Sequence, residues 1–234
     1  QYPHSLGLLY SAFTFFCGFK VNSGEYKLMG LAPYGTPKYA KKIKDYLIDI
    51  KPDGSFQLNL DYFGYLDTNF MIKEGFKRLF GGPPRAPETR ITKREMDLAS
   101  SVQVVLEDAI LALAQHTRKI TRLNRLVMAG GVALNCVANG KILSKGIFDQ
   151  FWIQPAAGDA GGALGAALLA SHQYFDIPRS VKDGRDNQKG SFLGPAYSPR
   201  EVEAYLKRYD LPYTQIIDRR NRAEAIAKAL AEGK

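Results

Sequence analysis

The sequence predicts an α/β fold with a parallel sheet, and three observations support this. An apolar run over residues 125–129 ends in two glycines and leads into a helical segment. The same order of strand, glycine-rich loop and helix returns over 148–174. A long helical pattern with one apolar face lies just before them, over about 93–119. Strands that alternate with helices favour a parallel sheet with helices packed on its faces.

The composition is that of an ordinary globular chain, with 45% hydrophobic and 24% charged residues among 234. A chain of this size buries enough surface to fold without disulfides. The two cysteines, Cys17 and Cys136, form neither a CxxC motif nor a disulfide framework, which predicts a reducing compartment. The apolar stretch over 5–19 is too short to span a bilayer. We therefore expect a cytoplasmic protein with no membrane partner.

The segments before the glycine loops are predicted from caps and periodicity. Thr36 and Pro37 predict the start of a helix that runs to about Ile48, and residues 56–60 alternate as a short strand. Residues 61–90 look irregular. Thr92 and Glu95 form a capping box for the helix over 93–119. The predicted buried face of that helix consists of Leu98, Val102, Val105, Ala109 and Leu113.

The tail of the chain has a different character. Residues 178–194 are polar and predict a linker. Ser198 is expected to cap a helix to about residue 209, followed by a strand over 213–217 and a helix over 222–231. One strand and two helices are too few for an independent core. We therefore expect the chain to be a fragment that stops inside a second domain.

Two glycine loops follow the two predicted parallel strands. Gly130 and Gly131 allow close backbone approach to an anion at a helix start, and the amide of Asn135 could bind a ribose, base or phosphate. Asp159, in the second loop, is either a helix cap or a ligand for a divalent metal that bridges to phosphates. Tight βα turns explain the same residues without any ligand. Together the loops favour a nucleotide site at the carboxyl edge of the sheet.

Other nucleotide motifs do not match. Neither loop is a GxGxxG dinucleotide fingerprint or a GxxxxGK[ST] P-loop. Glu25 and Lys27 lie in a glycine-punctuated run over 24–35, where a structural turn with a surface ion pair explains them equally well. His116 is interpreted as structural, because no second potential ligand lies at helical spacing from it.

In combination, the segments 5–11, 24–35, 129–135 and 154–167 resemble the O-carbamoyltransferases of antibiotic and nodulation-factor biosynthesis. The resemblance implies that residues 1–177 are the C-terminal part of a carbamoyltransferase domain. That domain has the actin/Hsp70/sugar-kinase ATPase-like fold and is similar to the universal tRNA threonylcarbamoyl-adenosine transferase. Residues 178–194 would then be a linker, and 195–234 would be the start of a YrdC-like α+β domain.

The resemblance also implies a reaction and a site. The family uses ATP and carbamoyl phosphate to make carbamoyl-adenylate, and transfers the carbamoyl group to a hydroxyl of a small-molecule or sugar acceptor beside a metal, usually iron. On this chain Gly130, Gly131 and Asn135 match the nucleotide-binding loop. Glu25 matches a ribose-binding acid and Gly35 a glycine against the nucleoside. Asp159 matches a metal ligand for iron or Mg²⁺, and a homodimer is a further expectation.

The sequence also departs from the family pattern. The paired histidine ligands of an HxxxH-type motif have no counterpart, since His4, His116 and His172 are scattered. No residue is identified as the catalytic base, and the arginine-rich adenylation site of the family would lie beyond Lys234. The expectation is therefore an O-carbamoyltransferase whose isolated fragment is inactive, with a nodulation factor as one acceptor.

Two other functions remain open. The first is an ATP-dependent kinase or hydrolase of the same fold, which would use the same two loops. The second is a basic RNA-binding module, suggested by the net charge of +9. The basic clusters over 38–44 and 219–222 lie far apart in the sequence, and no RRM-type aromatic motif accompanies them. We therefore do not expect nucleic acid as a partner.

Overall fold

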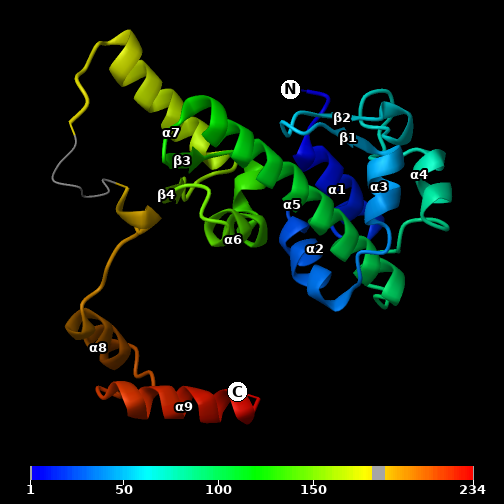
Figure 1. The fold of residues 1–234 in the computed structure, drawn as a ribbon. Helices are drawn as coiled ribbons and strands as arrows, with labels where there is room; N and C mark the ends of the chain where they lie inside the picture. The colour runs from blue at the N-terminus through cyan, green and yellow to red at the C-terminus, as the bar shows by residue number, and fades with distance from the viewer. Residues whose placement is uncertain (1, 181–187, 234) are drawn as a thin grey trace. The chain divides into compact units, whose positions relative to one another are not determined.

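A computed structural model describes residues 2–180 and 188–233 of the chain (Figure 1). It divides into two compact units, Gln1–Lys182 and Asp183–Lys234. The first unit contains, in chain order, α1 (Leu6–Phe16), α2 (Glu25–Leu31), α3 (Ala40–Tyr46), β1 (Ile48–Ile50), β2 (Phe56–Leu58), α4 (Glu74–Leu79), α5 (Lys93–Thr121), β3 (Arg125–Met128), α6 (Cys136–Ser144), β4 (Gln150–Ile153) and α7 (Ala160–Leu169). The second contains α8 (Pro199–Arg208) and α9 (Arg219–Ala231).

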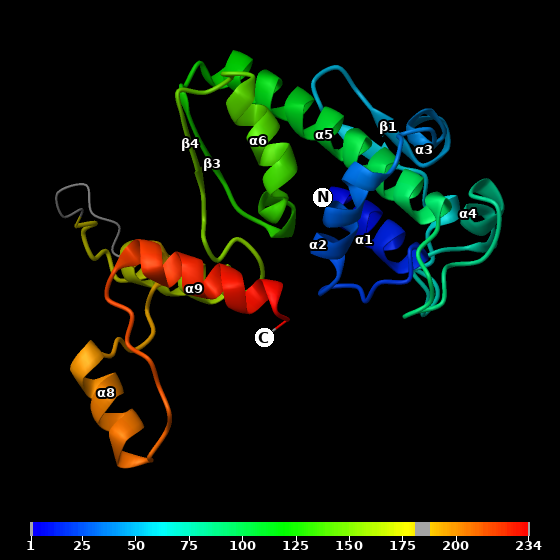
Figure 2. The same cartoon turned by 90° about the horizontal axis from the view of Figure 1, so that it is seen from below.

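Helix α5 is the axis of the first unit. It contacts α1, α2, α3 and α6, and the two views show α1–α4 near one end of it and α6, β3 and β4 near the other (Figures 1 and 2). The predicted capping box is confirmed, because the Glu95 carboxylate accepts hydrogen bonds from the backbone N–H and the hydroxyl of Thr92, at 2.9 and 2.5 Å. The predicted buried face is also confirmed. Its first four residues are fully buried and Leu113 is partly buried.

An aromatic cluster holds α4 against α1. Phe76 and Phe80 lie one helical turn apart at α4, and their rings meet those of Phe13 and Phe16 at centroid distances of 5.1–6.1 Å. The sequence analysis treated the region 61–90 as irregular and missed this helix. With six residues, α4 is too short to show a helical period, and its stability comes from the rings that it buries.

Two small sheets complete the first unit. Strands β1 and β2 are antiparallel, with Ile48 opposite Leu58. Strands β3 and β4 are parallel, with Leu126 opposite Phe151, so the predicted parallel pair is confirmed. The predicted strand over 56–60 is shorter than expected, because Asn59 caps a 3₁₀ turn at Leu60–Tyr62. The chain is a mixed α/β protein.

The segment before α3 is held by α5 and does not start a helix. The Thr36 backbone N–H and hydroxyl donate to Asp97 Oδ1 at 2.8 and 3.2 Å, and the Tyr39 N–H donates to the Ser101 hydroxyl at 3.0 Å. Thr36 is therefore not the predicted N-cap. Helix α3 begins only at Ala40 and ends at Tyr46, before β1.

Three further predictions need correction. The run 24–35 is not only a turn, since α2 forms from Glu25. The helical segment predicted directly after Gly130 and Gly131 starts as a 3₁₀ turn, Gly131–Leu134, and the α-helix α6 begins at Cys136. Residues 213–217 form no strand in the described part of the second unit, where no other strand is available to pair with them.

The second unit is two capped helices. The predicted capping box at Ser198 and Glu201 is present, and the Asp218 side chain caps α9. No residue of this unit over 188–233 is buried. Residues 181–187 of the predicted linker lie outside the described residues. Over 2–180 and 188–233, none of the helices combines the length and apolar character that crossing a membrane requires.

The Asp97 carboxylate gives a prediction about stability and pH. Burial alone would raise its pKa, but hydrogen bonds from Lys38 and Thr36 outweigh that effect and lower the pKa from 3.8 to about 2. Because the pKa of Asp97 is lowered in the folded protein, its ionised carboxylate contributes to the free energy of unfolding above pH 4. That contribution is lost as the pH falls toward 2. Asp97→Asn should reduce the free energy of unfolding at pH 7 by about 2 kcal/mol, since it removes charged hydrogen bonds.

The measurement is urea denaturation of both proteins between pH 7 and pH 2. The stability difference between the native protein and Asp97→Asn should shrink below pH 4. A difference that stays constant down to pH 2 would contradict the role of the Asp97 charge.

Candidate functional site

The first glycine loop joins β3 to α6. Gly130 has φ +96°, a conformation that favours glycine, and its N–H donates to the Ala157 carbonyl at 2.7 Å. A side chain at Gly130 or Gly131 would meet no heavy atom within 4 Å, so the space beside both is open. The first N–H groups of the turn that begins at Gly131 have no partner within the turn. The loop therefore combines backbone donors that its own turn does not use with open space beside its two glycines.

The second glycine loop joins β4 to α7, and its hydrogen bond to Gly130 places it beside the first. Ala157, in the second loop, is buried. A side chain at Gly161 would lie 2.1 Å from the Ala156 carbonyl oxygen, so this glycine is required by packing. Asp159 precedes α7, is exposed, and makes no side-chain hydrogen bond that caps the helix. The Asp159 side chain therefore does not cap α7 by a hydrogen bond, as the simpler of the two interpretations predicted.

Asn135 lies between the turn and α6, where it caps α6 through a hydrogen bond from the Ala138 N–H at 3.0 Å. Its side chain is buried and pairs reciprocally with the amide of Gln103 on α5. Gln103 Nε2 donates to Asn135 Oδ1, and Asn135 Nδ2 donates to Gln103 Oε1, each at 3.0 Å. The protein therefore uses both acceptor positions of Asn135 and at least one of its N–H groups within the network.

The network continues on both sides of this amide pair. The Tyr10 hydroxyl on α1 donates to Gln103 Oε1 at 2.9 Å, and burial raises the pKa of Tyr10 well above its usual range, so the donor stays protonated. Gln103 Nε2 also donates to Glu107 at 2.9 Å, and Glu107 is buried and ion-paired with Lys141 on α6. Three helices are thus joined to the first loop by buried polar contacts.

Glu25 lies at the start of α2, and its carboxylate is already well occupied. It accepts from the Ser11 hydroxyl at 2.8 Å, from the Asn22 N–H at 2.9 Å and from the Gly24 N–H at 3.2 Å. Ser11 directly follows Tyr10 on α1, so α1 connects Glu25 to the Asn135 network. The ribose-binding role of Glu25 stays a prediction.

Close packing explains why residue 35 is a glycine. A side chain there would lie 1.9 Å from the Met96 carbonyl oxygen of α5. Met96 is seven residues before Gln103, which is about 10 Å along a helix at 1.5 Å per residue. The structure therefore does not bring Gly35 into the same contacts as Asn135, and its nucleoside-binding role stays a prediction.

The residues present do not by themselves fit a metal. No group of three or more His, Cys, Asp or Glu side chains that could hold an ion occurs in the described part of the chain. His4 accepts a hydrogen bond from the Leu58 N–H, and His172 is paired with the Ile177 carbonyl. Asp159 is one carboxylate, and no catalytic step is assigned to a metal on this chain.

Sequence reasoning missed Gln103, Glu107 and Lys141. A signal was present, because Gln103 and Glu107 lie one helical turn apart, within the most apolar part of the α5 pattern. A buried polar pair at that spacing needs internal partners. Which partners they find depends on how α1 and α6 pack on α5, and that cannot be read from a local pattern.

The fold and the site define an α/β protein whose ligand-binding loops would lie at the carboxyl ends of two parallel strands. A family model described as "Carbamoyltransferase N-terminus" matches residues 1–168. The chain therefore belongs to the carbamoyltransferase family, as its motifs predicted.

Several curated proteins are similar to this chain. The uncharacterized protein sll1178 of Synechocystis is 57% identical over 207 residues, which cover 88% of this chain and 34% of that protein. The nodulation protein NolNO of Sinorhizobium fredii is 38% identical over 72% of this chain and 23% of its own length. The nodulation protein NolO of Bradyrhizobium diazoefficiens is 38% identical over 73% and 29%. The chain thus spans between 23% and 34% of the length of these relatives.

The amide pair gives a prediction about stability. Gln103→Leu keeps the approximate size of the side chain but deprives the Tyr10 hydroxyl and Asn135 Nδ2 of the Gln103 acceptor that both use in the structure. Each such group costs about 1–3 kcal/mol, so we expect the free energy of unfolding to fall by about 3 kcal/mol in urea denaturation. Gln115→Leu, at an exposed position of the same helix, is the control and should change it by at most about 0.5 kcal/mol. Equal effects of the two substitutions would contradict the network.

Gly35 gives a second prediction. Gly35→Ala should lower the free energy of unfolding by about 1–3 kcal/mol without any ligand, because the new methyl group overlaps the Met96 carbonyl. Thermal unfolding in the absence of nucleotide measures this loss. Gly140→Ala, on α6 with open space around it, should be neutral or stabilising. A Gly35→Ala protein as stable as the native one would contradict the packing role.

Proposed function

We propose that this chain contributes the nucleotide-binding loops of an ATP-dependent O-carbamoyltransferase. The observation that carries the proposal is the pairing of the two glycine loops through the Gly130–Ala157 hydrogen bond, with open space beside Gly130 and Gly131. An anion beside Gly131 would meet backbone N–H groups at the start of a helical turn. The family assignment supports carbamoyl transfer as the chemistry that these loops would serve.

In the proposed reaction, carbamoyl phosphate is hydrolysed to carbamate and phosphate, and a carbamate oxygen attacks the α-phosphate of ATP and displaces pyrophosphate. The phosphate of the resulting carbamoyl-adenylate would be held by the first loop. The acceptor hydroxyl oxygen forms a bond to the carbamoyl carbon while the bond to the adenylate phosphate breaks. AMP leaves, and the hydroxyl proton passes to a base. Backbone donors at Gly131 would stabilise the negative charge that returns to the phosphate. No residue of this chain is assigned as that base.

The finer parts of the proposal follow the resemblance. Residues 1–177 would belong to the ATPase-like fold, and 195–234 would begin a YrdC-like domain. The acceptor would be a small molecule or sugar with a free hydroxyl, and the names of the nodulation proteins make a nodulation factor one candidate. ATP as cofactor, Asp159 as one ligand of iron or Mg²⁺, a homodimer and a cytoplasmic location belong to the same proposal.

A nucleotide titration tests the loops. Calorimetric titration of this chain with ATP and with AMP should detect binding, and Gly131→Ala should weaken it at least tenfold, about 1.4 kcal/mol. The methyl group of that variant would enter space that is open in the structure, so the fold should be unaffected. Gly140→Ala introduces the same methyl group on α6 and should bind nucleotide like the native chain.

Two results would count against the proposal. One is the absence of binding by a chain whose circular dichroism shows it to be folded, and the other is equal affinity for both glycine variants. A kinase or hydrolase that used the same loops would release ADP and phosphate from ATP without carbamoyl phosphate. Release of AMP and pyrophosphate only when carbamoyl phosphate is present would distinguish the carbamoyltransferase in a full-length relative.

A further inference from the structure

Strand β3 has one edge without a partner strand in the described part of the chain, because its one pairing there is with β4. Hydrogen bonds show which backbone groups face β4. The Asn124 carbonyl accepts from the Gln150 N–H at 3.3 Å, and the Met128 carbonyl accepts from the Gln154 N–H at 3.2 Å. Backbone groups alternate along a strand, so those of Leu126 also face β4. The N–H and C=O groups of Arg125 and Val127 therefore face the open edge.

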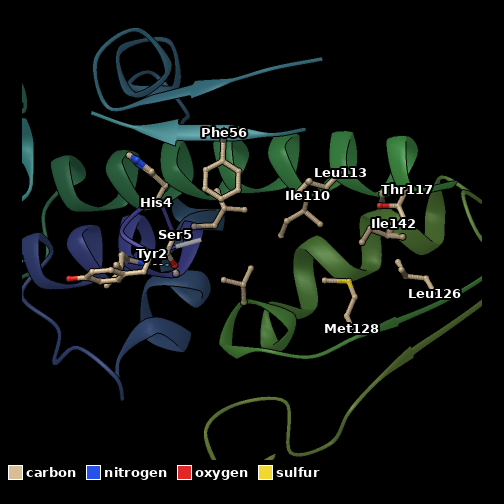
Figure 3. Close-up of a pocket in the computed structure, with 15 residues that line it drawn as sticks. Tyr2, His4, Ser5, Phe56, Ile110, Leu113, Thr117, Leu126, Met128 and Ile142 are labelled. Carbon is tan, nitrogen blue, oxygen red and sulfur yellow. Dashed lines mark hydrogen bonds between the residues drawn. The ribbon is translucent and has the colours of Figure 1, made fainter. Parts of the chain in front are cut away.

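An apolar groove of about 790 Å³ lies beside this strand (Figure 3). Leu126 and Met128 of β3 line it together with Ile142 of α6, and Ile110 and Leu113 of α5 line it from another side. In the close-up, the side chains of Met128, Ile142 and Ile110 approach the same hollow from three elements. The groove is thus a continuation of the apolar core that the described residues leave open.

An extended polypeptide fits both features at once. Parallel sheets are normally buried, and a two-stranded sheet with an open edge is not stable by itself. A strand added to that edge would pair with the backbone of Arg125 and Val127 and direct every second side chain into the groove. A small apolar molecule would fill the groove but leave the Val127 N–H to water, whereas a strand would pair with it. A second copy of this chain at this edge is the alternative that the test below distinguishes.

We propose that the open β3 edge and the adjoining groove bind an extended segment of carbamoyltransferase polypeptide from the part of the protein that this chain does not match. The length of the relatives supports this occupant, since the chain spans 23–34% of the three described above. The segment would have apolar side chains at alternate positions. The proposal rests on the family assignment and is independent of nucleotide binding.

Amide hydrogen exchange at single-residue resolution tests the edge. The native 234-residue chain is compared with full-length sll1178 of Synechocystis, whose match of 88% of this chain necessarily includes β3. The amides at Arg125 and Val127 should exchange at least tenfold more slowly in the full-length protein. The amides at Leu126 and Met128 face β4 in both proteins, so their protection should change less and serves as the internal control.

A binding experiment tests the occupant. The parts of sll1178 outside the match are produced separately and titrated against this chain. Val127→Pro removes the N–H at the open edge and should weaken binding at least tenfold, whereas Val127→Ala keeps the N–H and should bind within about twofold of the native chain. Thr117→Lys places a charge in the groove and should also weaken binding, while Gln115→Lys, exposed on the same helix, should not.

The outcomes separate the alternatives. Slow exchange at Arg125 and Val127 in the full-length protein, with a selective loss of binding for Val127→Pro and Thr117→Lys, supports the proposal. Equal exchange at these amides in both proteins would overturn it. Protection in this chain alone that disappears on dilution, together with a doubled mass, would assign the edge to a second copy and also overturn it.

Discussion

The reciprocal amide pair between Gln103 and Asn135 determines where the first glycine loop lies. Asn135 ends the turn that begins at Gly131 and caps α6, so the position of its side chain sets the direction of both segments. Gln103 is fixed in turn by Tyr10 and Glu107, which brings α1 and α6 into the same network. The side chains of this network are all buried, namely Tyr10, Gln103, Glu107 and Asn135. Losing a hydrogen-bond partner destabilises a protein more when the polar group is buried than when it is on the surface. The loop is therefore positioned by the core and does not depend on a ligand for its shape.

The glycines of the site divide into two kinds with different physical causes. At Gly35 and Gly161 a side chain would overlap a backbone carbonyl, so glycine is required by close packing. At Gly131 a side chain would meet open space, and packing gives no reason for glycine there. Gly131 therefore leaves room for a ligand, which the nucleotide site proposed above would use. This contrast makes Gly131 the most informative position of the loop, and it also removes Gly35 from the residues whose glycine argues for a nucleoside.

Prediction from the sequence succeeded where a pattern is long or local. The α5 face extends over four turns, and the capping boxes at Thr92 and Ser198 each involve only four residues, so these features could be read directly.

Prediction from the sequence failed where a distant contact decides the outcome. Thr36 has the sequence of a helix cap, but Asp97, 61 residues away, takes its hydrogen bonds. Helix α4 depends on rings from α1, and the roles of Gln103 and Glu107 depend on which helices pack beside them. The glycine loops were predicted from their order in the chain, while their direct contact at Gly130 and Ala157 required the structure.

The lysines around α3 are engaged in contacts within the protein, in contrast to the backbone donors of the first glycine loop. Lys38, Lys41 and Lys44 lie close together in the sequence and suggest an anion-binding surface. In the structure each pairs with an aspartate, at 2.8, 2.6 and 2.6 Å, and Lys42 donates to the Leu79 carbonyl at 3.1 Å. Lys38 and Lys44 use these contacts to join their segment to α5. A nucleic acid at this surface would have to compete with those carboxylates, so the excess of positive charge here does not favour such a partner. The donors at the Gly131 turn have no such competitor within their own helical turn, which is why the proposal above places an anionic ligand at backbone donors and not at these lysines.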